Sequence, residues 1–138
     1  MKVFLDTSAF AKRYVSEPGS ADVQTLCQQA DSLVVSVICL PELISTFSRL
    51  VREKKLANGE YRTLKAGAMA DLADVDICQF TPEVLASVVS LLESHPLRAM
   101  DALHVACALA VVPDRFVSAD HRQLAVARKA GLNIIDVS

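Results

Sequence analysis

Short apolar runs alternate with longer amphipathic stretches along almost the whole chain. Five runs are rich in β-branched, aliphatic or aromatic residues and are too short for helices, so we predict strands at residues 3–5, 33–37, 76–80, 115–118 and 133–137. The first run, Val3-Phe4-Leu5, has no polar residue between its members. Such a run is typical of a strand that is buried on both faces in the middle of a parallel sheet.

The stretches between these runs carry the start and stop signals of helices. Ser20 and Thr81 are good N-caps, and Gly131 suits a helix end. Pro41 and Pro82 suit a first helical turn. We expect helices at residues 8–15, 20–30, 41–55, 60–73, 82–94, 98–112 and 119–130. Strands that alternate with helices predict an α/β fold in which helices cover both faces of a parallel sheet of four to five strands.

Length and composition agree with this fold class. The chain has 138 residues, and we predict a single domain over residues 1–138 without repeats, low-complexity tracts or linkers. Hydrophobic residues make up 52% of it, aromatic residues only 5%, and tryptophan is absent, which suits an aliphatic α/β core. The formal net charge of −2 argues against a protein that holds nucleic acid by overall charge alone, but leaves local basic patches open.

Cysteine spacing and hydropathy indicate in which cellular compartment the protein is found. The four cysteines are widely separated among apolar neighbours, at Cys27, Cys39, Cys78 and Cys107. We interpret them as small buried side chains in a reducing cytosol rather than as disulfides or zinc ligands. The first strand follows Met1 at once, and every apolar stretch is interrupted well short of a membrane span. We therefore expect a cytoplasmic protein with no signal peptide and no membrane contact.

Two acids directly follow predicted strands. Asp6 comes after the first strand, and Asp120 comes two residues after Ser118, which ends the fourth. The carboxyl ends of parallel strands meet at one edge of the sheet, where ligands of α/β proteins bind. Taken alone, Asp6 could equally be the N-cap of the next helix, and Asp120 could equally be an acid at the start of a helix that Ser118 caps.

A third acid, Glu42, lies in the first turn of a helix. There the helix dipole favours any acid, so Glu42 by itself does not indicate a site. It shares a helix face with Ser45, Thr46 and Arg49. That polar stripe could be solvated or could line a site.

The fourth acid, Asp101, is the most informative. It lies in a helix that is apolar on nearly every side, and His104 is the only other polar side chain there. Removing an ionised carboxylate from water costs several kcal/mol unless a cation or a set of donors meets it. A metal ion is the natural partner, and an ion pair with Arg98 is the alternative. We interpret His104 as a core histidine.

In a parallel sheet these four acids converge on one edge. They would repel one another without a cation, and an oxygen-only cluster is what Mg²⁺ or Mn²⁺ selects. Such ions suit phosphoryl chemistry, because they lower the pKa of a bound water and stabilise the leaving oxygen. We expect Thr7, Ser8 and Ser118 to orient the carboxylates or metal-bound waters, although each could be a plain backbone cap.

Three basic residues lie near these acids in the sequence. Lys12 and Arg13 follow Asp6 by about two helical turns, and Arg49 shares the face of Glu42. We predict that all three reach the phosphates that flank a scissile bond. Ordinary solvated charges are the alternative, above all for Lys12.

Four stretches, FLDTSAFAKRYVSEPGS, LPELIS, LRAMDALHVACA and FVSADHRQLAVARKAGL, resemble in order the motifs of the PIN-domain family of metal-dependent ribonucleases, and within it the VapC-type toxins of toxin–antitoxin pairs. The resemblance implies a doubly wound three-layer α/β/α fold and endonucleolytic cleavage of RNA. It implies a Mg²⁺ or Mn²⁺ site formed by Asp6, Glu42, Asp101 and Asp120. It further implies a homodimer and a cognate antitoxin that inserts a segment into the active-site groove. Ser118 stands where the fourth motif commonly has Thr or Ser.

Two other functions fit parts of the pattern. A non-catalytic module of the same fold could use its acidic groove to dock a basic partner peptide. A phosphatase of the haloacid dehalogenase kind would need a second Asp two residues after Asp6, where Ser8 stands. We therefore predict a metal-dependent endoribonuclease, with the binding module as the alternative.

Overall fold

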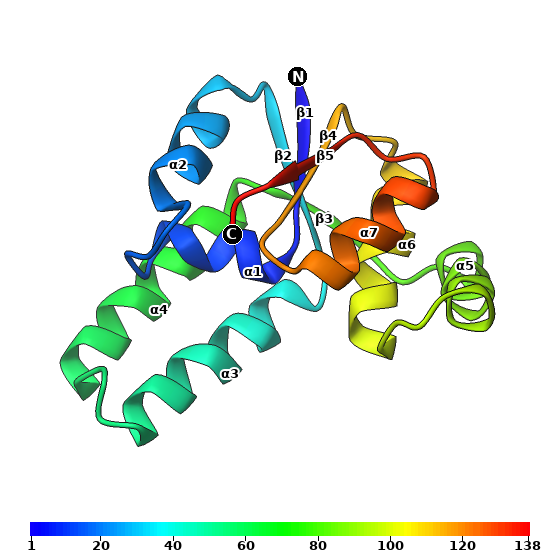
Figure 1. The fold of residues 1–138 in the computed structure, drawn as a ribbon. Coiled ribbons are helices and arrows are strands. Elements are labelled where there is room, and N and C mark those ends of the chain that lie inside the picture. Colours follow the sequence, from blue (N-terminus) through cyan, green and yellow to red (C-terminus); the bar gives the residue numbers. More distant parts are fainter.

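The computed structural model describes residues 1–138 and has a five-stranded parallel sheet with strand order β3-β2-β1-β4-β5 (Figure 1). The strands are β1 (Lys2–Leu5), β2 (Ser32–Ser36), β3 (Asp76–Cys78), β4 (Arg115–Ser118) and β5 (Ile134–Asp136). The prediction of a parallel sheet covered by helices is confirmed. The apolar first run is the central strand, paired on one side with β2 and on the other with β4.

Helices cover both faces of this sheet, and Figure 1 shows α1 to α4 on one side and α5 to α7 on the other. They are α1 (Thr7–Phe10), the 3₁₀ helix η1 (Ala11–Arg13), α2 (Ser20–Gln29), α3 (Cys39–Arg52), α4 (Asn58–Ala73), α5 (Pro82–Ser94), α6 (Ala99–Val111) and α7 (His121–Lys129). None of these helices is both long and apolar enough to cross a membrane.

Alternation along β1 divides the core into two layers, since successive side chains of a strand point to opposite faces. Val3 and Leu5 pack in the layer that includes Phe10 and Phe47. Phe4 packs in the other layer, built mainly from α5, α6 and α7, and its ring stacks on Phe116 with centroids 5.7 Å apart. The three apolar side chains of β1 are fully buried, which explains the unbroken apolar run.

The helix predicted at residues 8–15 differs from the structure. It is a single α-helical turn followed by the three-residue η1, after which the chain turns toward Gly19. Gly19 has φ +88°, and a Cβ there would lie 1.9 Å from the Val137 carbonyl oxygen. Glycine is therefore needed at this position, where the loop before α2 packs closely on the end of the chain.

Three helix starts also moved by two residues, and one of them is that of α4, which begins at Asn58 rather than at residue 60. The other two lie at the carboxyl edge of the sheet. Helix α3 begins at Cys39 rather than at Pro41, and proline is tolerated there because a first-turn N–H needs no partner within the helix. Helix α7 begins at His121 because Asp120 is its cap. Neither shift changes which residues leave the carboxyl edge of the sheet.

Candidate active site

A cavity of about 430 Å³, which we name the acidic pocket, lies where β1 and β4 end and α3 and α6 begin. The structure brings together in it the four acids predicted from the sequence, Asp6, Glu42, Asp101 and Asp120. Its polar wall also contains Thr7, Ser8, Glu17, Ser45, Thr46, Arg49, His104 and Gln123. The polar stripe of α3 therefore lines a cavity.

Asp6 is buried and fully hydrogen-bonded. Its Oδ1 accepts from the Ser8 hydroxyl at 2.7 Å and, as the cap of α1, from the Ala9 N–H at 2.9 Å. Its Oδ2 accepts from the Ser118 hydroxyl at 2.5 Å and from the side-chain amide of Gln123 at 2.6 Å. Burial raises the pKa of Asp6, and the nearby charge of His104, followed by the hydrogen bonds, opposes that rise. Ser8 and Ser118 thus hold a carboxylate, as the sequence analysis expected.

Glu42 is held from two sides. Its Oε1 accepts from the Thr7 hydroxyl at 2.6 Å and from Nε2 of His104 at 2.5 Å. Burial raises the pKa of Glu42, but these two donors more than offset it and hold the pKa below its ordinary value. His104 is only 2% exposed, and its Nδ1 is buried without a partner. It lies in the core, as expected, and it also orients an acid of the pocket.

Asp101 and Asp120 face the pocket with much of their charge uncompensated. Burial, followed by the nearby charge of Asp120, raises the pKa of Asp101. Arg98 lowers that pKa electrostatically, but the two side chains form no ion pair within 4.0 Å. Asp120 caps α7 with one oxygen, which accepts from two backbone N–H groups at 2.9 and 3.2 Å. Asp120 is therefore both an acid of the pocket and the cap of α7, a place for which the sequence suggested Ser118.

Besides His104, two polar residues of the pocket, Gln123 and Glu17, were not predicted from the sequence. Gln123 is 1% exposed, and its side chain reaches Asp6. The one feature of the sequence that could have indicated Gln123 is its place on a helix face that otherwise packs on the sheet, three residues after Asp120. Glu17 comes from the loop before α2, where nothing in the sequence distinguishes it from a solvated acid; its carboxylate lies 3.1 Å from Nζ of Lys12.

Of the basic residues predicted to contact RNA, Arg49 lines the acidic pocket. It is 59% exposed, and its nearest acid is Glu53 at 3.9 Å. Lys12 does not line this pocket: it is buried, and its Nζ donates to Glu17 and, at 2.7 Å, to the Pro18 carbonyl oxygen. Its predicted contact with RNA stays a prediction.

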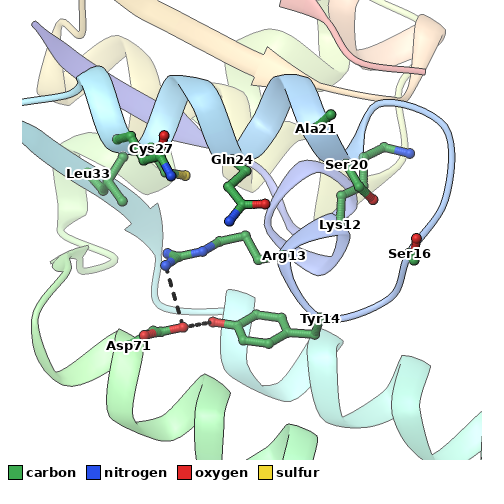
Figure 2. Close-up of a pocket in the computed structure, with 11 residues that line it drawn as sticks. Lys12, Arg13, Tyr14, Ser16, Ser20, Ala21, Gln24, Cys27, Leu33 and Asp71 are labelled. Atoms are coloured by element: carbon green, nitrogen blue, oxygen red, sulfur yellow. Dashed lines mark hydrogen bonds and ion pairs between the residues drawn. The ribbon is translucent and has the colours of Figure 1, made fainter.

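Arg13 faces a different cavity, of about 670 Å³, which we name the Arg13 cavity. Figure 2 shows its side chain extending from η1 toward Asp71 of α4, beneath α2. The guanidinium Nη2 lies 3.5 Å from Oδ2 of Asp71, which also accepts a 2.6 Å hydrogen bond from the Tyr14 hydroxyl. Its predicted contact with RNA also stays a prediction.

The donor set of the acidic pocket fits a hard divalent cation in its chemistry. No three His, Cys, Asp or Glu side chains lie close enough to hold a metal ion as they stand. Glu42 and Asp120 nevertheless each use only one oxygen in hydrogen bonds, and no hydrogen bond affects the pKa of Asp101. Mg²⁺ keeps several waters and needs only one or two direct carboxylates. The residues present therefore suit Mg²⁺ or Mn²⁺ held partly through water.

Comparisons with known proteins agree with this arrangement. The family model described as PIN domain matches residues 3–133. Ribonuclease VapC45 of Mycobacterium tuberculosis (strain CDC 1551) is 31% identical, and the match covers 96% of this chain and 93% of the relative.

Two solved structures share the fold at 16% identity. VapBC2 from Rickettsia felis, bound to a DNA fragment from its promoter, has a TM-score of 0.72 with full coverage of both chains. VapC20 of Mycobacterium tuberculosis, a sarcin-ricin loop cleaving toxin, has a TM-score of 0.70 and covers 94% of this chain and 95% of its own. The fold, the convergence of four acids and these matches together show that the chain belongs to the PIN domain family.

Proposed function

We propose that this PIN-domain protein is an endoribonuclease toxin that cleaves RNA phosphodiester bonds with Mg²⁺, for which Mn²⁺ substitutes, and that a cognate antitoxin neutralises it. One observation carries the proposal: four carboxylates from distant parts of the chain share one pocket, and no lysine or arginine forms an ion pair with any of them. Such a site has a net negative charge that a divalent cation relieves. The activity of the related ribonuclease supports the choice of RNA as substrate.

The chain's own residues have distinct tasks in this proposal. Glu42, Asp101, Asp120 and Asp6 form the binding site for the ion. Thr7 and His104 keep Glu42 ionised and hold its carboxylate in one orientation. The ion, when bound, supplies an activated water and stabilises charge on the phosphate and the leaving oxygen.

Arg49 is the cation best placed for the substrate. It is exposed and lies on the pocket wall, so it can contact a phosphate beside the scissile bond. An acidic pocket by itself repels RNA, and a cation at its rim reduces that repulsion. We expect Arg49 to contribute to substrate affinity rather than to the chemical step.

The partners follow from the relatives. Several structural relatives were solved as toxin–antitoxin complexes, which supports a small antitoxin as partner of this chain. We also propose that residues 1–138 act as one domain, that the protein forms a homodimer, and that it acts in the cytoplasm. A neighbouring gene for a small DNA-binding protein with an extended tail would fit this proposal.

A cleavage assay tests the proposal. The purified, antitoxin-free protein is incubated with total cellular RNA in Mg²⁺, in Mn²⁺ or in EDTA, beside Asp101→Asn and the exposed control Asp22→Asn. We expect discrete fragments only with metal, from the parent and the control. Cleavage in EDTA, or full activity of Asp101→Asn at matched metal, would contradict the site. Peptide binding without any cleavage would favour the non-catalytic module.

A further inference from the structure

All the hydrogen-bonding positions of Asp6 are occupied by the chain itself. A carboxylate offers about four lone pairs, and each Asp6 oxygen accepts two hydrogen bonds. No lysine, arginine or protonated amine lies within ion-pair distance of Asp6. The groups in direct contact with its carboxylate, which is 2% exposed, are therefore all neutral donors. This distinguishes it from Glu42 and Asp120, each of which keeps one oxygen free.

Three of the four donors are tied to the backbone framework. The Ala9 N–H belongs to the cap of α1. The Ser8 hydroxyl also accepts from the Ala119 N–H, and the Ser118 hydroxyl also accepts from the Asp120 N–H, both at 2.9 Å. These groups would be in place whether or not Asp6 needed a donor.

Gln123 is different. Its side chain makes a single hydrogen bond, the one to Asp6, and it is 1% exposed at the wall of the acidic pocket. Burying an amide group costs folding free energy unless the group is hydrogen-bonded, so a glutamine at this position needs a hydrogen-bond partner. Asp6 is that partner, and hydrogen bonds to a charged group are stronger than those between neutral groups.

We propose that Gln123 is a positioning residue that substitutes for the cation at Asp6 while the site holds no metal. This inference rests on the proposed function, because it presumes that the four acids bind a divalent ion. The Gln123 amide stabilises the Asp6 carboxylate most when no positive charge is near. Once a divalent ion compensates the same charge, the amide contributes less.

Because the amide stabilises Asp6 more without the ion than with it, removing the amide should change metal affinity in a predictable direction. A group that stabilises the metal-free state more than the metal-bound state opposes metal binding by the difference. Gln123→Met keeps the length and approximate volume of the side chain but removes the donor. The variant should be less stable without metal, and it should bind the ion more tightly.

The experiment compares the parent, Gln123→Met and the exposed α2 control Gln29→Met. Mn²⁺ alone is titrated calorimetrically, and thermal unfolding is followed in EDTA and in saturating Mn²⁺. We expect Gln123→Met to bind Mn²⁺ about three- to tenfold more tightly than the parent, with a lower Tm in EDTA and a larger rise in Tm on adding Mn²⁺. Gln29→Met should match the parent in all three measurements.

Each other outcome is decisive. Equal or weaker Mn²⁺ binding by Gln123→Met would overturn the inference and leave the proposed function standing. If the variant unfolds in EDTA, recovery of its folding by Mn²⁺ supports the inference, whereas unfolding in both conditions shows a packing role and overturns it. Absence of Mn²⁺ binding by the parent would overturn the proposed function itself, and this inference with it.

Discussion

Two cavities border the segment formed by α1 and η1, and they treat their acids in opposite ways. In the Arg13 cavity, Asp71 is met by a guanidinium at 3.5 Å and by the Tyr14 hydroxyl at 2.6 Å. In the acidic pocket, Asp6 is held by neutral donors and Asp101 by no donor that affects its pKa. The Arg13 cavity is the larger, at about 670 Å³ against about 430 Å³. Size therefore does not identify the site, whereas uncompensated charge does.

The difference has a physical consequence. A paired acid adds to the stability of the folded chain or leaves it unchanged, while clustered unpaired acids destabilise it until a cation arrives. The raised pKa of Asp101, caused by burial and then by Asp120, is the mark of that destabilisation. The fold tolerates it because the rest of the core is well packed, with all three apolar side chains of β1 fully buried.

The largest expected effect separates Asp6→Asn from Asp71→Asn. Both remove one negative charge from an acid beside the α1–η1 segment. Asp6→Asn should reduce RNA cleavage by about 100-fold or more, because it weakens the electrostatic site for the ion. Asp71→Asn should leave cleavage within about twofold, since Asp71 lies in the other cavity. Single-turnover rates at fixed Mg²⁺ measure both, and comparable losses in the two variants would erase the distinction between the cavities.

An intermediate effect is expected for the two arginines. Arg49→Ala should lower cleavage about three- to tenfold, mainly through KM, with a weaker dependence on salt concentration. Arg13→Ala should change KM little, because Arg13 faces Asp71 rather than the acidic pocket. Titration of RNA against each variant at several salt concentrations makes the comparison. Equal losses would restore Arg13 to the RNA-binding surface that the sequence predicted.

The smallest effect concerns stability without metal. The folded pKa of Asp101 is raised, so the folded state is favoured while this acid is protonated, and that contribution is lost as the pH rises through the folded pKa. In EDTA near pH 7, Asp101→Asn should therefore raise Tm, by roughly 1–2 °C after allowance for solvent screening.

The gain in Tm should disappear as the pH falls below the ordinary aspartate pKa of 3.8, where the acid is protonated in both states. It should also disappear in excess Mg²⁺, because the ion then compensates the charge. Thermal unfolding across this pH range measures both trends. A gain that is independent of pH would show that the charge of Asp101 is not its cause.

Most of the fold, and the membership of the acid cluster, could be predicted from the sequence. The unbroken apolar run Val3-Phe4-Leu5 predicted a central strand because it is too short for a helix and a strand covered on both faces needs no polar positions. Asp6 and Asp120 then had to share an edge, because parallel strands point the same way. Asp101 stood out because a charge in an apolar helix needs a partner. These are local patterns, and each is written within a few consecutive residues.

Contacts between distant residues were decided only by the tertiary structure. Gln123 meets Asp6 across 117 positions of sequence, and His104 meets Glu42 across 62. Whether a polar side chain at a buried helix position reaches an acid depends on how two elements pack, and periodicity gives only the face on which it lies. The same holds for Lys12 and Arg13, whose closeness to Asp6 along the chain did not bring them to the acidic pocket. The parallel direction of the strands, which the sequence pattern predicted, explains why these acids gather at one edge, whereas the packing of helices on the sheet decided which neutral groups hold them.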